Sequence, residues 1–246
     1  MAKEIVVIPK LPEGELLYAV GDIHGRSDLL IKLLRQIEAD AARRSAARKT
    51  LVFLGDYVDR GPDSRGVVDL LLFSPPKGFD DIHFLKGNHE ALLLDFLADP
   101  GGLDHWLMNG GDATMASYGV DVDLLNAMGA GPEAWRNAFT DVLPQLHRNF
   151  FESLRLQVFA GDYLFVHAGV KPGVPLDAQA ESDLIWIRGP FLRAEQSFGK
   201  VVVHGHTPVR APEIKANRIG IDTGAVFSGQ LTALRLQDGD RDFLQT

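Results

Sequence analysis

A short apolar run followed by a polar loop recurs six times along this chain of 246 residues. The loops read GDIHG, GDYVDRG, GNHE, HAG, HGHT and DTG, and they follow runs such as LLYAV and LVFL. The runs have the length and β-branched content of strands, and open sheets bind ligands in the crevice beyond their strand ends. Because random surface turns would not favour the same few metal-binding residue types, the pattern indicates one site assembled from several strand ends.

The apolar runs also predict the fold class. We expect strands at 16–20, 51–54, 82–85, 163–166, 201–203, 219–221 and 231–236. Helical stretches separate the early strands and predict βαβ units; one helix is expected to begin at Ser27, taken as its N-cap. The later strands lie closer together, which favours antiparallel pairing. The sequence therefore predicts an α/β fold in which two facing sheets are flanked by helices.

Residues 99–150 interrupt the strand pattern with Gly-rich turns and two candidate helices. We interpret this segment as an insertion that forms one wall of a cleft. Residues 1–246 are thus predicted to form a single domain with a mainly helical insertion at about 99–150, a size that one large core can accommodate.

Composition excludes several classes of function. The formal net charge of -8 argues against a general nucleic-acid binder. The absence of cysteine excludes disulfides, zinc–thiolate sites and thiol nucleophiles. The N-terminal residues lack the continuous apolar region of a secretory signal, and no segment is long enough to span a membrane. We therefore expect a cytoplasmic protein that binds neither membrane nor nucleic acid.

The loops deliver seven oxygen or imidazole donors, a set that suits Mn, Fe, Zn or Mg better than a soft metal. They are Asp22, His24, Asp56, Asn88, His89, His167 and His206. A lone Asp or His would be read as a cap or a satisfied core group, but seven arriving together indicate a metal centre. They exceed what one tetrahedral ion with an open position requires, so two ions bridged by a shared carboxylate are the natural interpretation.

GDIHG, GDYVDRG, GNHE, His167 and GHT, in this order, resemble the phosphoprotein phosphatase family of calcineurin-like metallophosphoesterases, in particular its bacterial and phage serine/threonine protein phosphatases. The resemblance extends from Gly21 to about Gly224 and implies a four-layer metallophosphatase fold. It implies two divalent ions, with manganese favoured and Fe, Zn or Mg as alternatives. By matching position, Asp22 and His24 would bind the first ion, Asp56 would bridge, and Asn88, His167 and His206 would bind the second.

The same resemblance assigns the remaining site residues. Arg60 and Arg188, assisted by Asn88, would hold the phosphate, and His89 would be the general acid, oriented by Asp59. Hydroxide bridging the two ions would attack phosphorus in line. Among neighbouring residues, we expect Glu90 to be a helix-start residue, His204 to be a packed neighbour, and Asp222 to lie behind the ligands.

Three functions are compatible with these residues. GNHE and the Arg of GDYVDRG favour hydrolysis of phosphoserine and phosphothreonine in a protein or peptide partner. The alternative is a bis(5'-nucleosyl)-tetraphosphatase or another small-molecule phosphatase, whose bacterial members typically show GNHD and lack that Arg. A non-catalytic binding protein is the third reading, which the full ligand set disfavours. The oligomeric state is left open, and a monomer is compatible with the sequence.

Overall fold

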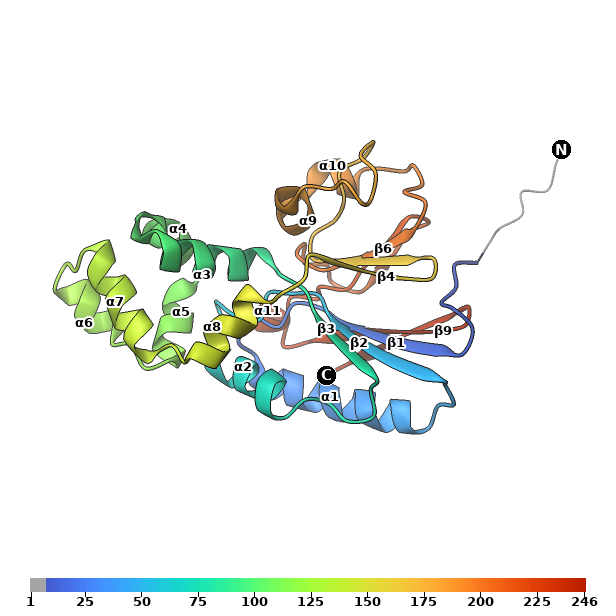
Figure 1. Ribbon diagram of the computed structural model, residues 1–246, viewed down its shortest axis with the longest axis horizontal. Coiled ribbons are helices and arrows are strands. Elements are labelled where there is room, and N and C mark those ends of the chain that lie inside the picture. The colour runs from blue at the N-terminus through green and yellow to red at the C-terminus, as the bar shows by residue number, and fades with distance from the viewer. Residues whose placement is uncertain (1–7) are drawn as a thin grey trace.

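The computed structural model describes residues 8–246 and contains two five-stranded sheets that face each other (Figure 1). The first sheet has the order β10-β9-β1-β2-β3, and the second has the order β4-β5-β6-β8-β7. The strands of the first sheet are β1 (Glu15–Val20), β2 (Arg48–Phe53), β3 (Asp81–Phe84), β9 (Thr232–Gln237) and β10 (Asp240–Gln245). Those of the second are β4 (Gln157–Ala160), β5 (Tyr163–Val166), β6 (Val201–His204), β7 (Glu213–Ile214) and β8 (Arg218–Gly220).

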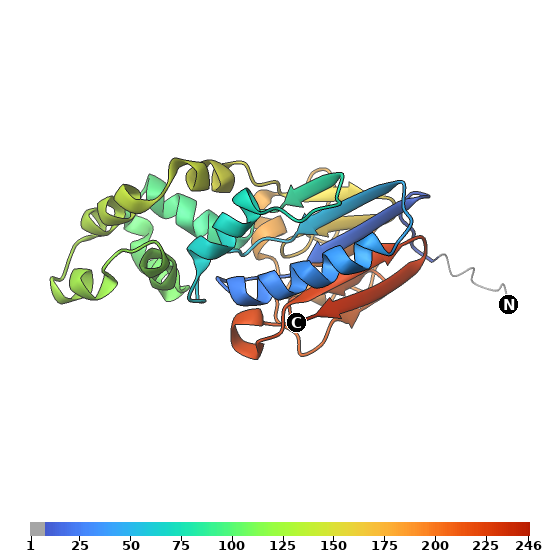
Figure 2. The ribbon, with the colours of Figure 1, turned by 90° about the horizontal axis from the view of Figure 1, so that it is seen from below.

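Helices cover the outer face of each sheet. Figure 2 shows α1 (Ser27–Ala42) lying along the first sheet, with α2 (Ser64–Phe73) beside it. On the opposite side of the molecule, α9 (Glu181–Trp186) and α10 (Gly189–Leu192) lie over the second sheet (Figure 1). The short helix α11 (Ala225–Ser228) precedes β9. This arrangement confirms the predicted α/β fold of two mixed sheets flanked by helices.

Three apolar cores join the four layers, because successive side chains of a strand point to opposite faces. In β1, Leu16 and Tyr18 belong to the core beneath α1, whereas Leu17 belongs to the core between the sheets. In β5, Phe165 faces the first sheet and Leu164 packs in the core beneath α9 and α10. Strands buried on both faces need continuous apolar runs, which is why the sequence shows runs and not alternation.

Parallel pairing brings the polar loops to one edge. In the first sheet, β1 pairs parallel with β2 and β2 with β3, and in the second, β5 pairs parallel with β6 and β6 with β8. The carboxyl ends of the strands that precede the polar loops therefore meet on the same side. Antiparallel partners complete both sheets, namely β9 and β10 in the first and β4 and β7 in the second.

All seven predicted strands are present, with ends shifted by up to three residues. Three further strands, β4, β7 and β10, were not predicted. β7 is only two residues long, and β10 is an edge strand with charged side chains at Asp240, Arg241 and Asp242. Charged edges protect a sheet from unwanted pairing, and they also remove the apolar pattern by which a strand is recognised.

The prediction that Ser27 is the N-cap of α1 is wrong. Arg26 occupies the cap position and makes no side-chain cap bond, while Ser27 is the first helical residue. The Ser27 hydroxyl instead donates to the carboxylate of Asp63, which also accepts from the backbone N–H of Gly66 at the start of α2. Asp63 thus recruits the hydroxyl that would otherwise cap α1.

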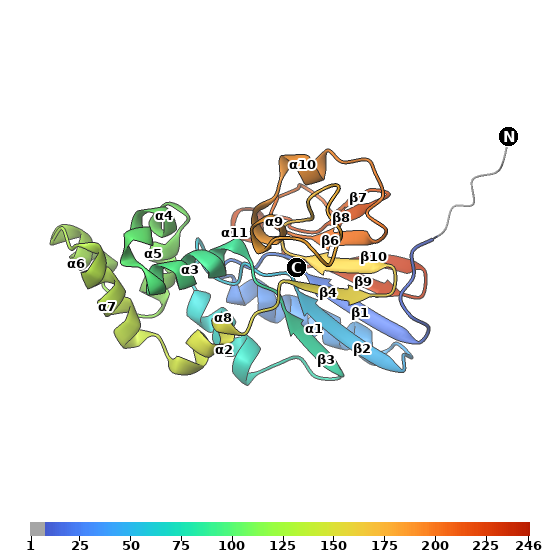
Figure 3. The ribbon, with the colours of Figure 1, turned by 45° about the horizontal axis from the view of Figure 1, so that its top comes forward.

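Residues 99–152 form more helices than the two expected. After α3 (Asn88–Ala98) and a 3₁₀ turn (Pro100–Gly102) come α4 (Leu103–Met108), α5 (Gly111–Ser117), α6 (Val122–Ala127), α7 (Pro132–Val142) and α8 (Gln145–Glu152). Gly110, Gly119 and Gly129 adopt positive φ at the breaks between them, a conformation that suits glycine. Figure 3 shows these helices extending to one side of the sheets, beyond the edge where the polar loops meet. Within residues 8–246, no helix is long and apolar enough to cross a membrane.

Candidate metal centre

The two sheets bring predicted site residues into two groups that share one carboxylate. One group contains His24, Asp56 and His89, and the other contains Asp56, His167 and His206. Within each group the candidate ligand atoms lie within 4.8 Å of one another, and every member is buried. Asp56 belongs to both groups, the arrangement that a carboxylate bridging two cations requires.

In two of the histidines, a backbone carbonyl fixes the imidazole nitrogen that faces away from the site. His24 places Nδ1 2.9 Å from the carbonyl of Val58, and His167 places Nδ1 2.9 Å from the carbonyl of Leu54. Each Nδ1–H donates to a carbonyl, which turns Nε2 into the site. Metal-binding histidines are commonly oriented by such a bond at the second nitrogen.

Asp22 has a buried carboxylate oxygen without a hydrogen-bond partner. Its Oδ2 accepts from the backbone N–H of His206 at 2.9 Å, but Oδ1 is one of four buried, unpartnered side-chain atoms among residues 8–246. An unpartnered buried carboxylate oxygen is costly, and a cation would satisfy it. The donor set therefore fits divalent metal ions, although Asp22 lies outside the two compact groups found among the described residues.

Burial and neighbouring charges shift the protonation of these groups in different directions. Burial lowers the pKa of His24 to about 3, which keeps the imidazole neutral and ready to bind a metal. Burial also opposes a charge on His167, but the adjacent Asp56 carboxylate raises its pKa to about 10. Burial and the charge of Asp222 raise the pKa of Asp22 well above its ordinary value. Bound cations would favour the deprotonated form of all three.

The backbone of the site is strained. Positive φ occurs at only six non-glycine residues in the range 8–246. Five of them belong to the predicted site, namely His24, Asp56, Asp59, Arg60 and His206. Each such residue costs of order 1–3 kcal/mol, and residues of this kind cluster at functional sites. The turns aim side chains from adjacent positions at the same point.

Two glycines of the motifs allow the close approaches on which this geometry depends. A Cβ at Gly87 would collide with the carboxylate of Asp56, and a Cβ at Gly205 would collide with that of Asp22. Glycine is therefore required in GNHE and HGHT because another loop's carboxylate occupies the space that a side chain would fill.

Glu90 does more than begin a helix. It is fully buried, and its carboxylate accepts from the backbone N–H groups of Asp56 (2.9 Å), Tyr57 (2.8 Å) and Gly87 (2.9 Å). The bond from the Gly87 N–H caps the N-terminus of α3, as expected of a helix-start residue. The bonds from Asp56 and Tyr57 hold the loop after β2. The final Glu of GNHE therefore fixes the conformation of the loop that carries Asp56.

His89 and Asp59 form a hydrogen-bonded pair beside the metal ligands. His89 Nδ1 lies 2.7 Å from Asp59 Oδ2, and both side chains are buried. Although burial opposes its charge, the carboxylates of Asp56 and Asp59 raise the pKa of His89. His89 Nε2 points into the centre, 3.9 Å from Asp56 Oδ2. A proton could therefore be held at Nε2 and directed at a bound molecule.

Arg60 and Arg188 lie on either side of the centre, and each contacts a histidine of a different ligand group. Arg60 Nη1 lies 2.8 Å from His24 Nε2, and Arg188 Nε donates to His206 Nε2 at 2.9 Å. Each guanidinium thus contacts the nitrogen lone pair that a cation would use. The structure brings both sequence-predicted arginines to the site, together with all the predicted ligands.

Sequence reasoning missed three polar residues that support Asp59. Trp106 Nε1 lies 3.0 Å from Asp59 Oδ2, Thr114 Oγ1 donates to Asp59 Oδ1 at 2.7 Å, and Ser64 Oγ accepts from the Asp59 N–H at 3.1 Å. The signal for Trp106 was weak: a buried tryptophan needs a partner for its N–H, but sequence does not identify which one.

His204 and Asp222 have the roles expected of them. His204 is a buried neighbour whose Nε2 lies 3.3 Å from Arg218 Nη1. Asp222 accepts from the backbone N–H of Gly224, and burial raises its pKa to about 6. Asp222 lies close enough to Asp22 for its charge to raise the pKa of that predicted ligand.

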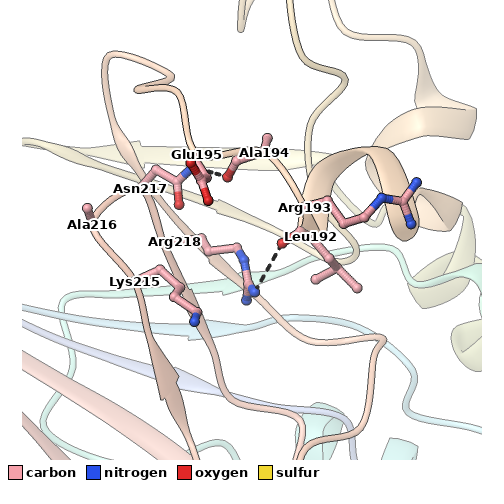
Figure 4. Close-up of a pocket in the computed structure, with 8 residues that line it drawn as sticks. All are labelled: Leu192, Arg193, Ala194, Glu195, Lys215, Ala216, Asn217 and Arg218. Carbon is pink, nitrogen blue, oxygen red and sulfur yellow. Dashed lines mark hydrogen bonds between the residues drawn. The ribbon is translucent and has the colours of Figure 1, made fainter.

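A cavity of about 430 Å³ lies away from this centre, between α10 and the β7–β8 hairpin. Figure 4 shows the side chain of Arg218 directed at the carbonyl of Leu192 and that of Asn217 directed at Ala194. These bonds attach the hairpin to the last residue of α10 and to the chain that follows it. Its lining includes none of the predicted ligands, so we interpret its polar groups as structural.

Comparison with known proteins identifies the family. The family model for calcineurin-like phosphoesterases matches residues 16–237. The chain is 32% identical to serine/threonine-protein phosphatase 1 of Salmonella typhimurium, over 89% of this chain and 91% of that protein. The chain belongs to the calcineurin-like phosphoesterases, a family of hydrolases that use divalent metal ions.

Other proteins similar to this chain are named for a different substrate class, the dinucleoside polyphosphates. The chain is 29% identical to the asymmetrical bis(5'-nucleosyl)-tetraphosphatase PrpE of Bacillus velezensis, over 89% of this chain and 88% of that protein. A crystal structure of a putative diadenosine tetraphosphatase has the same fold, with a TM-score of 0.63, 23% identity and 96% of each chain covered. Family membership therefore leaves two substrate classes to be distinguished.

Proposed function

We propose that this protein is a metal-dependent phosphomonoesterase that hydrolyses phosphoserine and phosphothreonine in proteins. The observation that carries the proposal is the placing of His89, Asp59, Arg60 and Arg188 around the two ligand groups that share Asp56. When bound, two divalent cations, with manganese favoured, would activate water and offset charge on the phosphoryl oxygens.

The proposal divides the predicted ligands between two ions. Asp22 and His24 would bind one ion, Asn88, His167 and His206 would bind the other, and Asp56 would contact both. The contact of 3.1 Å between Asn88 Oδ1 and His167 Nε2 supports placing these two side chains on the same ion.

The arginines would hold the phosphate. A guanidinium and a cation compete for the same imidazole lone pair, so each arginine must find another acceptor once metal is bound. The oxygens of a phosphomonoester suit that purpose, since the planar fork of arginine contacts two oxygens while remaining charged. Asn88 would assist through its amide.

His89 would donate the proton to the leaving group. The alkoxide of serine or threonine is a poor leaving group at neutral pH, and general acids contribute roughly 10²- to 10⁴-fold in such reactions. The Asp59 carboxylate accepts from the Nδ1–H of His89, so the proton available for donation is the one at His89 Nε2, which faces the centre. A substrate with a good leaving group would need this proton much less.

The protein-phosphatase reading is supported by Arg60 and by the similarity to the Salmonella enzyme. Glu90 supports it less than the sequence suggested. Its carboxylate holds backbone N–H groups of the loop after β2, so the difference between GNHE and GNHD reflects loop construction at least as much as substrate.

A second candidate function, hydrolysis of dinucleoside polyphosphates, is favoured by an aromatic surface beside the centre. The Trp186 side chain is 38% exposed, and its ring centroid lies 6.2 Å from that of His206. The ring of His105 is nearly parallel to it, with centroids 6.2 Å apart. Nucleobases stack on exposed aromatic rings of this kind.

A hydrolysis panel separates the two functions. Purified protein supplemented with Mn²⁺ is assayed on a phosphoserine peptide, a phosphotyrosine peptide, p-nitrophenyl phosphate and diadenosine tetraphosphate. We expect the highest kcat/KM on the phosphoserine peptide. A clear preference for the dinucleotide, lost in Trp186→Leu, would replace our proposal with the second candidate.

A further inference from the structure

The helical segment after α3 contacts the site at the Asp59–Arg60 pair. Trp106 is on α4 and Thr114 is on α5, and the turn between these helices contains Gly110. The Gly110 carbonyl accepts from the backbone N–H of Arg60 at 3.1 Å. With φ of +92°, Gly110 packs so closely on Arg60 that a Cβ there would lie 2.8 Å from the Arg60 nitrogen.

Donors surround the Asp59 carboxylate completely. The indole N–H of Trp106 is shared between Oδ1 (3.1 Å) and Oδ2 (3.0 Å), the Thr114 hydroxyl donates to Oδ1, and His89 donates to Oδ2. All of these side chains are at most 1% exposed. Two of the three donors come from the insertion, so the insertion determines the direction in which the carboxylate faces His89.

Thr114 is the centre of this network. A hydroxyl has one hydrogen to donate and two lone pairs that accept. Its hydrogen is directed to Asp59 Oδ1, and Oγ1 accepts from the Asp59 backbone N–H at 2.8 Å while lying 3.0 Å from the Ser64 hydroxyl. Every hydrogen bond that the Thr114 hydroxyl can make is therefore made with Asp59 or with Ser64, which also supports Asp59.

We propose that Trp106 and Thr114 are positioning residues for the general acid, so that the helical insertion acts on the reaction through Asp59 and His89. This inference rests on the proposed function, because it assumes that His89 donates the proton. Neither residue contacts the reacting atoms. Their contribution is to prevent the Asp59 carboxylate from rotating, which would let the imidazole turn away from the leaving group.

The test compares an alkyl phosphomonoester with p-nitrophenyl phosphate. Thr114→Val removes the hydroxyl at nearly constant volume, and Trp106→Phe removes the indole N–H. We expect each to lower kcat on the alkyl substrate by about tenfold, a fraction of the general-acid contribution, with KM and bound metal unchanged. The loss on the aryl substrate should be less than about threefold, since its leaving group needs little protonation. Thr114→Ser should restore most of the activity.

Two controls separate positioning from a general loss of structure. Thr140→Val, at an exposed threonine of α7, should change neither substrate. Equal losses on both substrates in Thr114→Val, or loss of bound metal, would overturn the proposal. In a His89→Asn background, Thr114→Val should cause no further loss, because it acts through the same proton; an additive loss would also overturn it.

His89→Asn alone distinguishes this inference from the function beneath it. If it damages both substrates equally, the general-acid role fails, and the positioning role fails with it. If His89→Asn is selective for the alkyl substrate but Thr114→Val is not, the general acid stands and only the positioning role fails.

Discussion

The strand-end loops and the helical insertion are stabilised in opposite ways. The loops bury charged side chains and hold five residues at positive φ, whereas the insertion packs aromatic rings. Phe139 lies 5.4 Å from Trp106 and 5.6 Å from Tyr118 between ring centroids. The difference shows that function is concentrated where the chain is strained and polar, and that folding energy is supplied by apolar contacts elsewhere.

Trp106 belongs to both regions. Its ring packs against Phe96 and Phe139, while its N–H reaches Asp59. An apolar body with one polar edge suits a residue at such a boundary. The comparison therefore predicts that mutations in the loops affect activity, that mutations in the aromatic core of the insertion affect stability, and that only insertion residues bonded to Asp59, such as Trp106, affect activity as well.

The largest effect is expected at the carboxylate shared by the two ligand groups. Asp56→Asn should lower kcat/KM by about 10³-fold or more, because cation binding on both sides depends on this charge. Metal content measured by atomic absorption should fall in parallel, while the thermal midpoint in chelator shifts by no more than about 5 °C. Asp141→Asn, at an exposed carboxylate of α7, is the control. Retention of two metal ions would contradict the bridging role.

A core mutation in the insertion should show the reverse pattern. Phe139→Ala removes a fully buried ring and should lower the free energy of unfolding by about 3–5 kcal/mol in urea titrations. Val142→Ala, on the same helix but 36% exposed, should cost less than about 1 kcal/mol. The folded Phe139 variant should still bind metal. Loss of metal without loss of stability would break the division between the two regions.

The smallest effect concerns pH. His147 of α8 is buried between Tyr118 and Asp69, with Nδ1 2.8 Å from the tyrosine hydroxyl and Nε2 3.1 Å from Asp69 Oδ1. Burial lowers its pKa below the ordinary value of 6.5 and outweighs the opposing charge of Asp69. The unfolded chain therefore binds more protons near pH 6, so this contribution to stability is present above 6.5 and is lost as pH falls.

His147→Gln should remove that pH dependence. Urea midpoints measured at about pH 7.5 and about pH 5.5 should differ less in the variant than in the wild type. His105→Gln, at an exposed histidine, should leave the dependence unchanged. A larger difference between the two midpoints in the variant than in the wild type would show that the Asp69 pair dominates over burial.

Much of the centre was predictable because its residues are adjacent to strand ends. Apolar runs identify the parallel strands, and parallel strands bring the residues that follow them to one edge. The structure accordingly gathers Asp56, His167 and His206 from segments far apart in the chain. Ser27, by contrast, could not be placed correctly, because the carboxylate that takes its hydroxyl belongs to Asp63, a residue remote in sequence.

By itself, the sequence determined seven of the ten strands, the order of the motifs, the donor types and the family. These follow from local patterns: the period of apolar residues, and the residue types that can bind metal or phosphate. Only the tertiary structure decided that Glu90 holds the Asp56 loop, that a glycine faces each of two carboxylates, and that Trp106 and Thr114 reach Asp59. Such contacts join residues tens of positions apart, and a hydrogen bond across that separation depends on folded geometry that no local pattern encodes.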